Sequence, residues 1–506
     1  MKPLLVALLI FTSVACCGQY PYDAKRDNIW LFGYNDGTNP HPLFGVTQLK
    51  FDADSFAISK VDSFADFQET VAIACDSEGK LLFSTNGIWL YDSTFNKTLT
   101  SDTLNPGSWA EANTGLGYPV VQGALILKKP ESSSLYYVFH ARLGDNGRSE
   151  GVYYTIVDMS IHSAITLNVP IVSNTILENG KLAACRHANG RDWWILFWKA
   201  GSNMYRRLLF NPQGVSDFGW SSVGIPLSSN LGFGQNVFSP DGSKYIQHNI
   251  YYSYVIDVYD FNRCTGQLTN NIHIIENDTC YSGGCAISQD GKRLYVACSQ
   301  ELFQYDLTSN NIQNSRTTVA LWDGFVDPDF SLGATYFHLL GLTPDGKIIC
   351  NTPNSTKYLH SIEYPDSLGA SCQVQQHNLN LFTFNSGTIP NYPNFRLGPV
   401  DGSACDTLGI DVGIHENAKA HYTAESVLQA YPNPAANYCN IGFGNTLKQD
   451  GALIVYDLNG RKVFEASLQK ATIGYTLKTE DYTSGLYLCV VYEGNTEKGR
   501  VRFVKE

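Results

Sequence analysis

Hydrophobic and polar residues alternate over short stretches along most of this chain, and tight turns separate these stretches. Four segments share one arrangement: an apolar strand, an Asp-Gly or Glu-Gly turn, a strand rich in Leu, Ile and Tyr, and a third strand. They are CDSEGKLLFSTNGIWLYD from Cys75, SPDGSKYIQHNIYYSYVIDVYDF from Ser239, SQDGKRLYVACSQELFQYDL from Ser288 and TPDGKIICNTPNSTKYLHSIEY from Thr343. Glycine supplies the positive φ that the turns require. The pattern predicts short antiparallel strands joined without crossovers.

Two weaker copies begin at Leu125 and Cys185, so six units are visible, with turn glycines mostly about 50 residues apart. Such a unit cannot bury both of its faces alone, whereas packing several units around an axis does so. Strand-like segments 28–33, 46–52, 378–387 and 394–398 belong to no complete unit. We expect them to build one shared blade, which gives a seven-bladed β-propeller without exposed edges. A ring of six or eight blades is the first alternative, and a two-domain β-sandwich is the second.

The two ends of the chain differ from this repeat. One lysine precedes an apolar run from Leu4 to Cys17, which is too short to span a bilayer. This predicts a secretory signal peptide over residues 1–18, with lipoprotein processing at Cys16 as the alternative. The propeller is then expected over residues 19–402. Residues 403–426 have no strand period and predict a linker.

Residues 427–506 return to a strand pattern, with one hairpin in GALIVYDLNGRKVFEAS and another in SGLYLCVVYEGNTEKGRVRFVKE. About seven short strands predict a small C-terminal β-sandwich. The order of YPNPA, VYDLNGRKV and the closing hairpin resembles the C-terminal sorting domain of type IX secretion cargo. The resemblance assigns the sorting motif to Tyr431, Pro432, Asn433, Pro434, Asp457, Gly460, Arg461, Gly485, Leu486, Tyr487 and Lys505.

This resemblance implies a route and two partners. The chain would cross the inner membrane, fold in the periplasm and pass through the type IX translocon. A sortase would remove the tail, so the protein would be secreted or held on the outer cell surface. The first part of the chain also resembles, more loosely, uncharacterised secreted β-propellers, through segments such as NIWLFG and GKLLFSTNG. That likeness supports the fold and implies no activity.

Composition narrows the function classes further. The formal net charge is −12, and no basic block occurs, which disfavours nucleic acid and anionic membranes as partners. Eleven cysteines remain outside the signal peptide, an odd number, so at least one is not paired within the chain. The spacing of Cys280 and Cys285 does not fit a zinc site, and we expect no metal and no cofactor.

Candidate binding residues come directly after the second strand of each unit, where the loops of a propeller converge. They are Asn86, His140, Arg142, Trp198, Lys199, His248, Asn249, Ser299 and Asn351. We expect this rim to make the protein a binding or adhesion module for glycan or protein ligands. The alternative is a secreted polysaccharide-active hydrolase or lyase that uses loop carboxylates such as Asp327 and Asp329. No catalytic motif supports it, and no catalytic residue is assigned.

Overall fold

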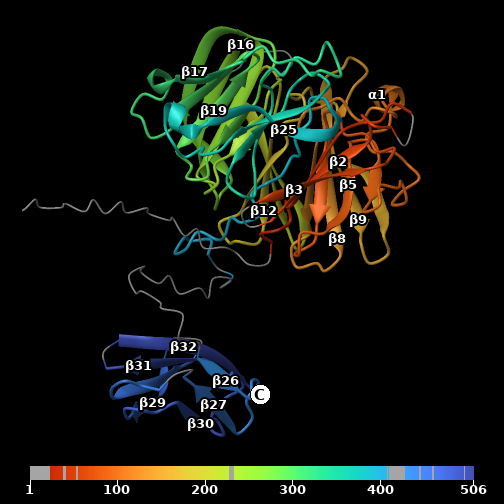
Figure 1. Ribbon diagram of the computed structural model, residues 1–506. Coiled ribbons are helices and arrows are strands. Elements are labelled where there is room, and N and C mark those ends of the chain that lie inside the picture. The colour runs from red at the N-terminus through yellow and green to blue at the C-terminus, as the bar shows by residue number, and fades with distance from the viewer. Residues whose placement is uncertain are drawn as a thin grey trace, which may run out of the picture. The chain divides into compact units, whose positions relative to one another are not determined.

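The computed structural model describes residues 23–37, 41–52, 55–226, 233–406, 408, 428–443, 446–457, 461–494 and 496–506. The chain divides into two compact units, one within residues 1–412 and the other within residues 413–506. Strands make up most of the regular structure in both units (Figure 1). The predicted signal peptide and residues 409–427 lie outside the described residues. Among the described residues, no helix has the length and apolar character needed to cross a bilayer.

The described part of the first unit contains seven antiparallel sheets, and each sheet consists of strands that are consecutive along the chain. The first three are β1–β3 (Ile29–Phe32, Val46–Phe51, Phe56–Val61), β4–β6 (Ala72–Cys75, Leu81–Thr85, Leu90–Asp92) and β7–β10 (Ala124–Lys128, Leu135–Leu143, Ser149–Asp158, Ser163–Val172). The next two are β11–β14 (Ala183–Arg186, Trp193–Trp198, Met204–Asn211, Gly214–Ser222) and β15–β17 (Asn236–Phe238, Lys244–Asn262, Gln267–Cys280). The last two are β18–β21 (Cys285–Ile287, Arg293–Cys298, Glu301–Asp306, Thr317–Leu321) and β22–β25 (Leu340–Leu342, Ile348–Cys350, Thr356–Ile362, Val374–Asn385). Short helical turns occupy loops: α1 (Ser108–Ala112), η1 (Gln313–Ser315) and η2 (Gly369–Cys372).

The predicted turn chemistry is confirmed at the repeated hairpins. Between β18 and β19, Ser288 donates a hydrogen bond from Oγ to Asp290 Oδ1 (2.7 Å), and Gly291 N donates to Ser288 O (2.9 Å). Gly291 has φ +74°, a conformation that a side chain disfavours. The corresponding turns at Ser239–Gly242 and Thr343–Gly346 make the same two contacts.

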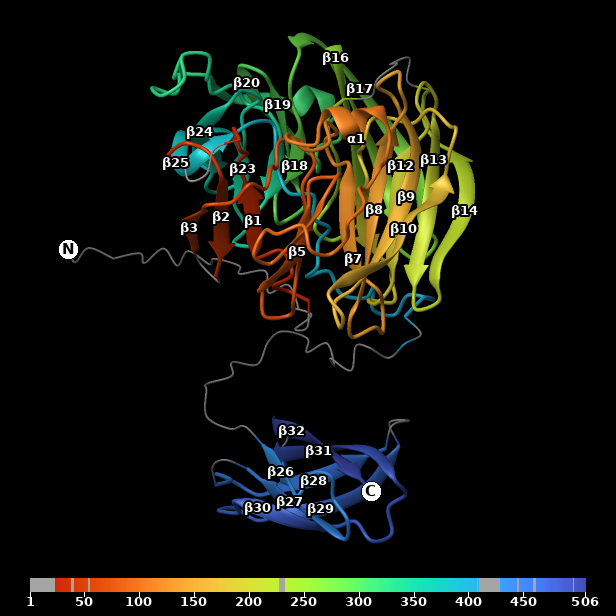
Figure 2. The ribbon, with the colours of Figure 1, turned by 90° about the vertical axis from the view of Figure 1, so that its right-hand side faces the viewer.

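Hydrophobic clusters lie between consecutive sheets and hold them in order around the unit (Figure 2). One further cluster closes the sequence of sheets, because Trp30 and Leu49 of the first sheet pack with Leu359 and Leu381 of the last. Each sheet therefore buries both faces against its two neighbours. This is the arrangement that the repeat pattern required.

The first sheet lacks the innermost strand that the other sheets have. β4 ends at the Asp76–Gly79 turn. β1 begins beside this turn, because Asn28, the residue before β1, has its Cβ only 3.2 Å from the position that a Cβ on Gly79 would take. β1 therefore runs in the opposite direction to β4, as a second strand does. Residues 389–393 lie along its free side: Ile389 packs with Trp30, and Tyr392 donates from its hydroxyl to Ile29 O (2.7 Å).

This arrangement corrects part of the expected shared blade. Residues 378–387 belong mainly to β25, which pairs with β24 in the last sheet. The preceding strand β24 is close in the sequence and can pair as a hairpin, whereas the strands of the first sheet are far away in the sequence. Residues 394–398 form no strand, although the sequence pattern predicts one. Pro390 and Pro393 lack the N–H donors that a ladder needs, so the returning segment binds through side chains instead.

Residues 396–405 also contact the rest of the first unit. Arg396 forms an ion pair with Asp27 (2.6 Å), and Arg263 Nη2 donates to Gly398 O. A disulfide joins Cys264 to Cys405, at the start of the predicted linker. Of the other cysteines, the nine described ones are free and buried, and a buried free cysteine acts as a small hydrophobic residue.

The second unit has two sheets around one hydrophobic cluster that includes Leu453, Val455 and Phe503. One sheet consists of β26, β27 and β30 (Gln429–Tyr431, Tyr438–Gly442, Gly474–Lys478). The other consists of β29, β28, β31 and β32, in that order (Lys462–Leu468, Gly451–Tyr456, Gly485–Glu493, Thr496–Lys505). Both predicted hairpins are present, as β28–β29 and β31–β32.

Candidate functional site

The residues predicted to form a binding rim lie at the ends of second strands, as expected, but most of them are not on the surface. Six of the nine candidates are buried: Asn86, His140, Trp198, His248, Asn249 and Asn351. Lys199 is exposed and Ser299 is half-buried. Arg142 is half-buried, with its guanidinium over the Tyr153 ring. The predicted rim requires side chains that are exposed to a ligand, and these six side chains are buried. Ligand binding by them stays a prediction.

Two of these buried side chains, Asn86 and Asn351, hold neighbouring backbone in place. Asn86 Oδ1 accepts from the backbone N–H groups of Ile88 (3.1 Å) and Trp89 (2.9 Å). Asn351 accepts from Leu339 N (2.7 Å) and donates to Thr388 O (2.7 Å). A polar residue directly after a strand can thus serve to hydrogen-bond the backbone N–H and C=O groups of nearby turns.

The buried histidines give a testable pH dependence. Burial lowers the pKa of both His140 and His248 to about 3, and the pKa of His360 to about 4. The unfolded chain binds these protons near pH 6.5, so stability is lost as the pH falls below 6.5. The free energy of unfolding should fall by about 1.4 kcal/mol per pH unit for each such histidine between pH 6 and 4.5.

Urea unfolding of the wild type and His140→Gln across this range measures the slope. The variant should lose the slope of one histidine. The substitution His162→Gln, at an exposed position, is the matched control and should leave the slope unchanged. Parallel pH profiles for the wild type and His140→Gln would contradict a neutral, buried His140.

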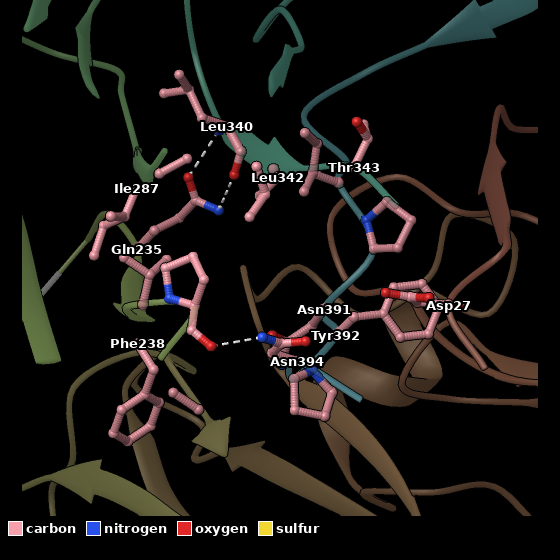
Figure 3. Close-up of a pocket in the computed structure, with 18 of the residues that line it drawn as sticks. Asp27, Gln235, Phe238, Ile287, Leu340, Leu342, Thr343, Asn391, Tyr392 and Asn394 are labelled. Atoms are coloured by element: carbon pink, nitrogen blue, oxygen red, sulfur yellow. Dashed lines mark hydrogen bonds between the residues drawn. The ribbon is translucent and has the colours of Figure 1, made fainter. Parts of the chain in front are cut away.

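One hollow of the first unit is an axial cavity of about 570 Å³. It lies between the first strands β11, β15, β18 and β22, the aromatic side chain of Trp30 and the returning segment 389–397. Figure 3 shows Gln235, Phe238, Ile287, Leu342 and Tyr392 around it. The hollow is thus enclosed by backbone edges and by side chains of several sheets, which is typical of a small-ligand site.

A layer of amide side chains fills the axis at the end where the first strands begin. Gln235 accepts at Oε1 from Leu340 N (2.9 Å) and Cys285 N (3.1 Å), and donates to Leu340 O (3.1 Å; Figure 3). Gln122 donates to Asn236 O (2.9 Å) and accepts from Asn236 N (2.8 Å). Asn391 donates to Ala124 O and Leu182 O, both at 2.9 Å. We call Gln122, Gln235 and Asn391 the amide layer.

Turn residues line the other end of the cavity, including Pro240, Gln289 and Pro344. Asn394 Nδ2 donates to Pro240 O (2.7 Å) and fixes the returning segment there (Figure 3). Of the lining carboxylates, Asp27 is neutralised by Arg396, and Asp345 accepts from the Thr343 hydroxyl. Within the described residues, Trp30 Nε1 is buried and has no hydrogen-bond partner.

Sequence reasoning missed the amide layer and the axial cavity. The available signal was TIPNYPNFRL (residues 388–397), where prolines flank asparagines after the last strand. Such a segment is extended but cannot join a ladder, so its amide side chains must find other partners.

The loop carboxylates considered for catalysis are engaged in local contacts. Asp327 is buried and accepts from Lys357 N (2.8 Å) and Asp329 N (2.9 Å). Asp329 forms an ion pair with Lys357 Nζ. Within the described ranges, no group of three His, Cys, Asp or Glu side chains is arranged to hold a metal ion.

In the second unit, the YPNP segment is attached to the last strand. Asn433 Oδ1 accepts from Val504 N (2.8 Å), and Ala435 N donates to Val504 O (2.7 Å). Ala435 also forms a parallel bridge with Lys505, the last residue of β32. The opening and closing motifs, far apart in sequence, are therefore one structural element.

The other sorting-motif residues have separate places. Tyr431 is 75% exposed, whereas Tyr487 is buried and stacks on Phe503 (5.5 Å between ring centres). Asp457 accepts from Arg461 N (3.0 Å), and Gly485 pairs with Lys505. Gly460 lies outside the described residues.

Residues 429–506 match the family described as the secretion system C-terminal sorting domain. The second unit is a type IX sorting domain. The sorting domain makes this chain a secreted or cell-surface cargo that interacts with the type IX machinery, as the sequence resemblance predicted.

Solved structures similar to the chain have low identity. A functionally unknown protein from Desulfotomaculum acetoxidans is 14% identical, with 72% of this chain and 99% of that chain covered and a TM-score of 0.40. The periplasmic gluconolactonase of Pseudomonas aeruginosa is 11% identical (74% and 98% covered, TM-score 0.35). The Dos1 propeller is 12% identical (64% and 74% covered, TM-score 0.36). No curated protein matches the chain.

Proposed function

We propose that the first unit is a seven-bladed β-propeller that binds a glycan or protein ligand outside the cell, with the axial cavity as its ligand site. Its seven consecutive sheets and the cluster that joins the last sheet to the first support the blade number. The mature propeller would span residues 19–402, after a signal peptide at residues 1–18. A linker over residues 403–426 would lead to the β-sandwich sorting domain over residues 427–506.

The observation that carries the binding role is the chemistry of the axial cavity. Its lining combines aromatic rings (Trp30, Phe238, Tyr392) with neutral amides and backbone groups. Of its two carboxylates, Asp27 is paired with Arg396, and Asp345 accepts from the Thr343 hydroxyl. Neutral polar groups beside aromatic surface suit an uncharged ligand such as a sugar residue or a peptide backbone.

A blocked cavity tests this proposal. Leu342 lines the cavity (Figure 3), and Leu342→Trp should fill part of it and weaken binding about tenfold or more, because a ligand group would lose about 1.4 kcal/mol or more of contact. The mature chain is first screened on arrays of neutral oligosaccharides and of peptides. The affinity for the retained probe is then measured by titration.

Leu321→Trp is the matched control, because Leu321 is exposed on β21, and it should bind as the wild type does. Equal affinity for both variants would place the ligand outside the cavity. Cleavage of the retained oligosaccharide, seen as new reducing ends, would overturn the binding role in favour of a hydrolase.

A further inference from the structure

A buried polar cluster links the fourth and fifth sheets of the first unit. It consists of Glu178 and Lys181, between β10 and β11, and of Gln247, His248 and Asn249 in β16. The exposed fractions are 0% for Lys181, 3% for Asn249 and 4% for Glu178. Three such groups in one dry site are costly unless each finds a partner, so their arrangement is informative.

The Lys181 amine is in contact with the side-chain amide of Asn249. Nζ donates to Asn249 Oδ1, to Glu178 Oε2 (3.2 Å) and to His248 O (3.0 Å). Since a carbonyl bond is about 1.2 Å long, the contact with Oδ1 brings Nζ within roughly 3.7 Å of Asn249 Cγ. This is close to the separation from which a nucleophile attacks a carbonyl carbon.

The surroundings favour attack by an uncharged amine. Burial lowers the pKa of Lys181, which moves the amine toward its neutral, nucleophilic form. Glu178 contacts the same Nζ and is held by Gln247, whose Nε2 donates to Glu178 Oε1 (2.9 Å). The amide nitrogen of Asn249 is buried and has no partner among the described residues, so no hydrogen bond holds it in place.

The backbone at Lys181 supports a special role. Lys181 has φ +56° and follows Gly180 with φ +66°, so two successive residues adopt the left-handed conformation. A lysine seldom does so, and the surrounding structure must hold the backbone of Lys181 in this conformation.

We propose that Lys181 and Asn249 form an intramolecular isopeptide bond that joins the segment before β11 to β16. The Lys181 amine attacks Asn249 Cγ, and the Nζ–Cγ bond forms. Glu178 accepts a proton from Nζ and returns one to Nδ2. The Cγ–Nδ2 bond then breaks and ammonia leaves, so the product is a secondary amide, Glu178 is regenerated and no oxidant or cofactor is needed.

The bond would cross-link two neighbouring sheets covalently. Such a link limits the conformations open to the unfolded chain, as a disulfide does, and it is insensitive to reduction. The Cys264–Cys405 disulfide ties the end of the unit to the β16–β17 hairpin, whereas the isopeptide bond would tie the fourth sheet to the fifth. The two links would hold different parts of the propeller.

Intact mass spectrometry of the reduced and denatured full-length mature protein tests the proposal. The wild type should weigh about 17 Da less than its sequence, beyond any 17 Da lost by cyclisation of the N-terminal glutamine, because one ammonia has left. Tryptic digestion should give one branched peptide joining the chains around Lys181 and Asn249. A wild-type mass equal to the sequence mass would overturn the proposal and leave a permanent buried ion pair.

Variants assign the roles of the residues. Lys181→Arg and Asn249→Leu should show no mass deficit, and Glu178→Gln should lose it wholly or form it more slowly. Lys462→Arg is the matched control, because Lys462 also contacts a glutamate three residues away but is exposed, and it should keep the full deficit. A deficit that forms at the wild-type rate in Glu178→Gln would overturn the proton-transfer role of Glu178.

Discussion

Removal of residues 429–506 is expected to stop the protein from reaching the outside of the cell. The sorting domain carries the interaction with the type IX machinery, so the shortened chain should accumulate in the periplasm. The first unit should still fold, because each unit has its own hydrophobic clusters. Immunoblots of the culture medium, the cell surface and the periplasm measure the distribution. Circular dichroism and thermal unfolding check that the first unit is intact.

Lys462→Ala in the full-length protein is the control for this experiment. The Lys462 side chain is exposed and its ammonium forms an ion pair with Glu465, so replacing it with alanine should leave both the sorting-domain fold and export unchanged. If the shortened chain reached the medium in normal amounts, the export route argued from the sorting domain would be wrong.

Replacing Asn391 with Leu is expected to cost about 3–5 kcal/mol in the free energy of unfolding, because the substitution leaves several buried groups without partners, at about 1–3 kcal/mol each. The side chains have similar volumes, so packing changes little. The groups that lose a partner are the carbonyls of Ala124 and Leu182 and the Gln122 amide. The midpoint of urea unfolding, with its slope unchanged, measures the loss.

Asn394→Leu is the matched control three residues further along the same segment. Asn394 is half-buried and donates to one carbonyl, Pro240 O, so this substitution should cost about 1 kcal/mol. Equal losses in the two variants would mean that the amide layer contributes no special stability and that the segment matters only as a whole.

In both units of the molecule, the sequence predicts the features that depend on residues close together in the chain. In the repeat, the turns at Ser239–Gly242, Ser288–Gly291 and Thr343–Gly346 fold as expected, because their chemistry is contained in four or five consecutive residues. The order of strands in each sheet also follows, since short hairpins pair locally. The sorting domain was predicted because its motifs occur in a fixed order over its whole length.

The exposure of the predicted rim residues could not be read from the sequence in this way. His140, His248 and Asn351 follow second strands as the sequence indicated, but neighbouring sheets and loops cover them. Whether a polar side chain after a strand faces solvent or a neighbouring loop depends on residues far away in sequence. His140, for example, contacts Asn105 at 2.7 Å, and Asn351 contacts Thr388.

By itself the sequence determined the all-β character, the repeated sheets, the hairpin turns and the sorting tail, because each rests on local periodicity or on residues close in the chain. Only the tertiary structure decided how the ring closes and where it is hollow. Residues 389–397 take the place of an innermost strand although their prolines prevent pairing, and their asparagines bind carbonyls more than 150 residues away. The contact of Lys181 with Asn249 is of the same kind, since the packing of two sheets, and no nearby motif, brings amine and amide together.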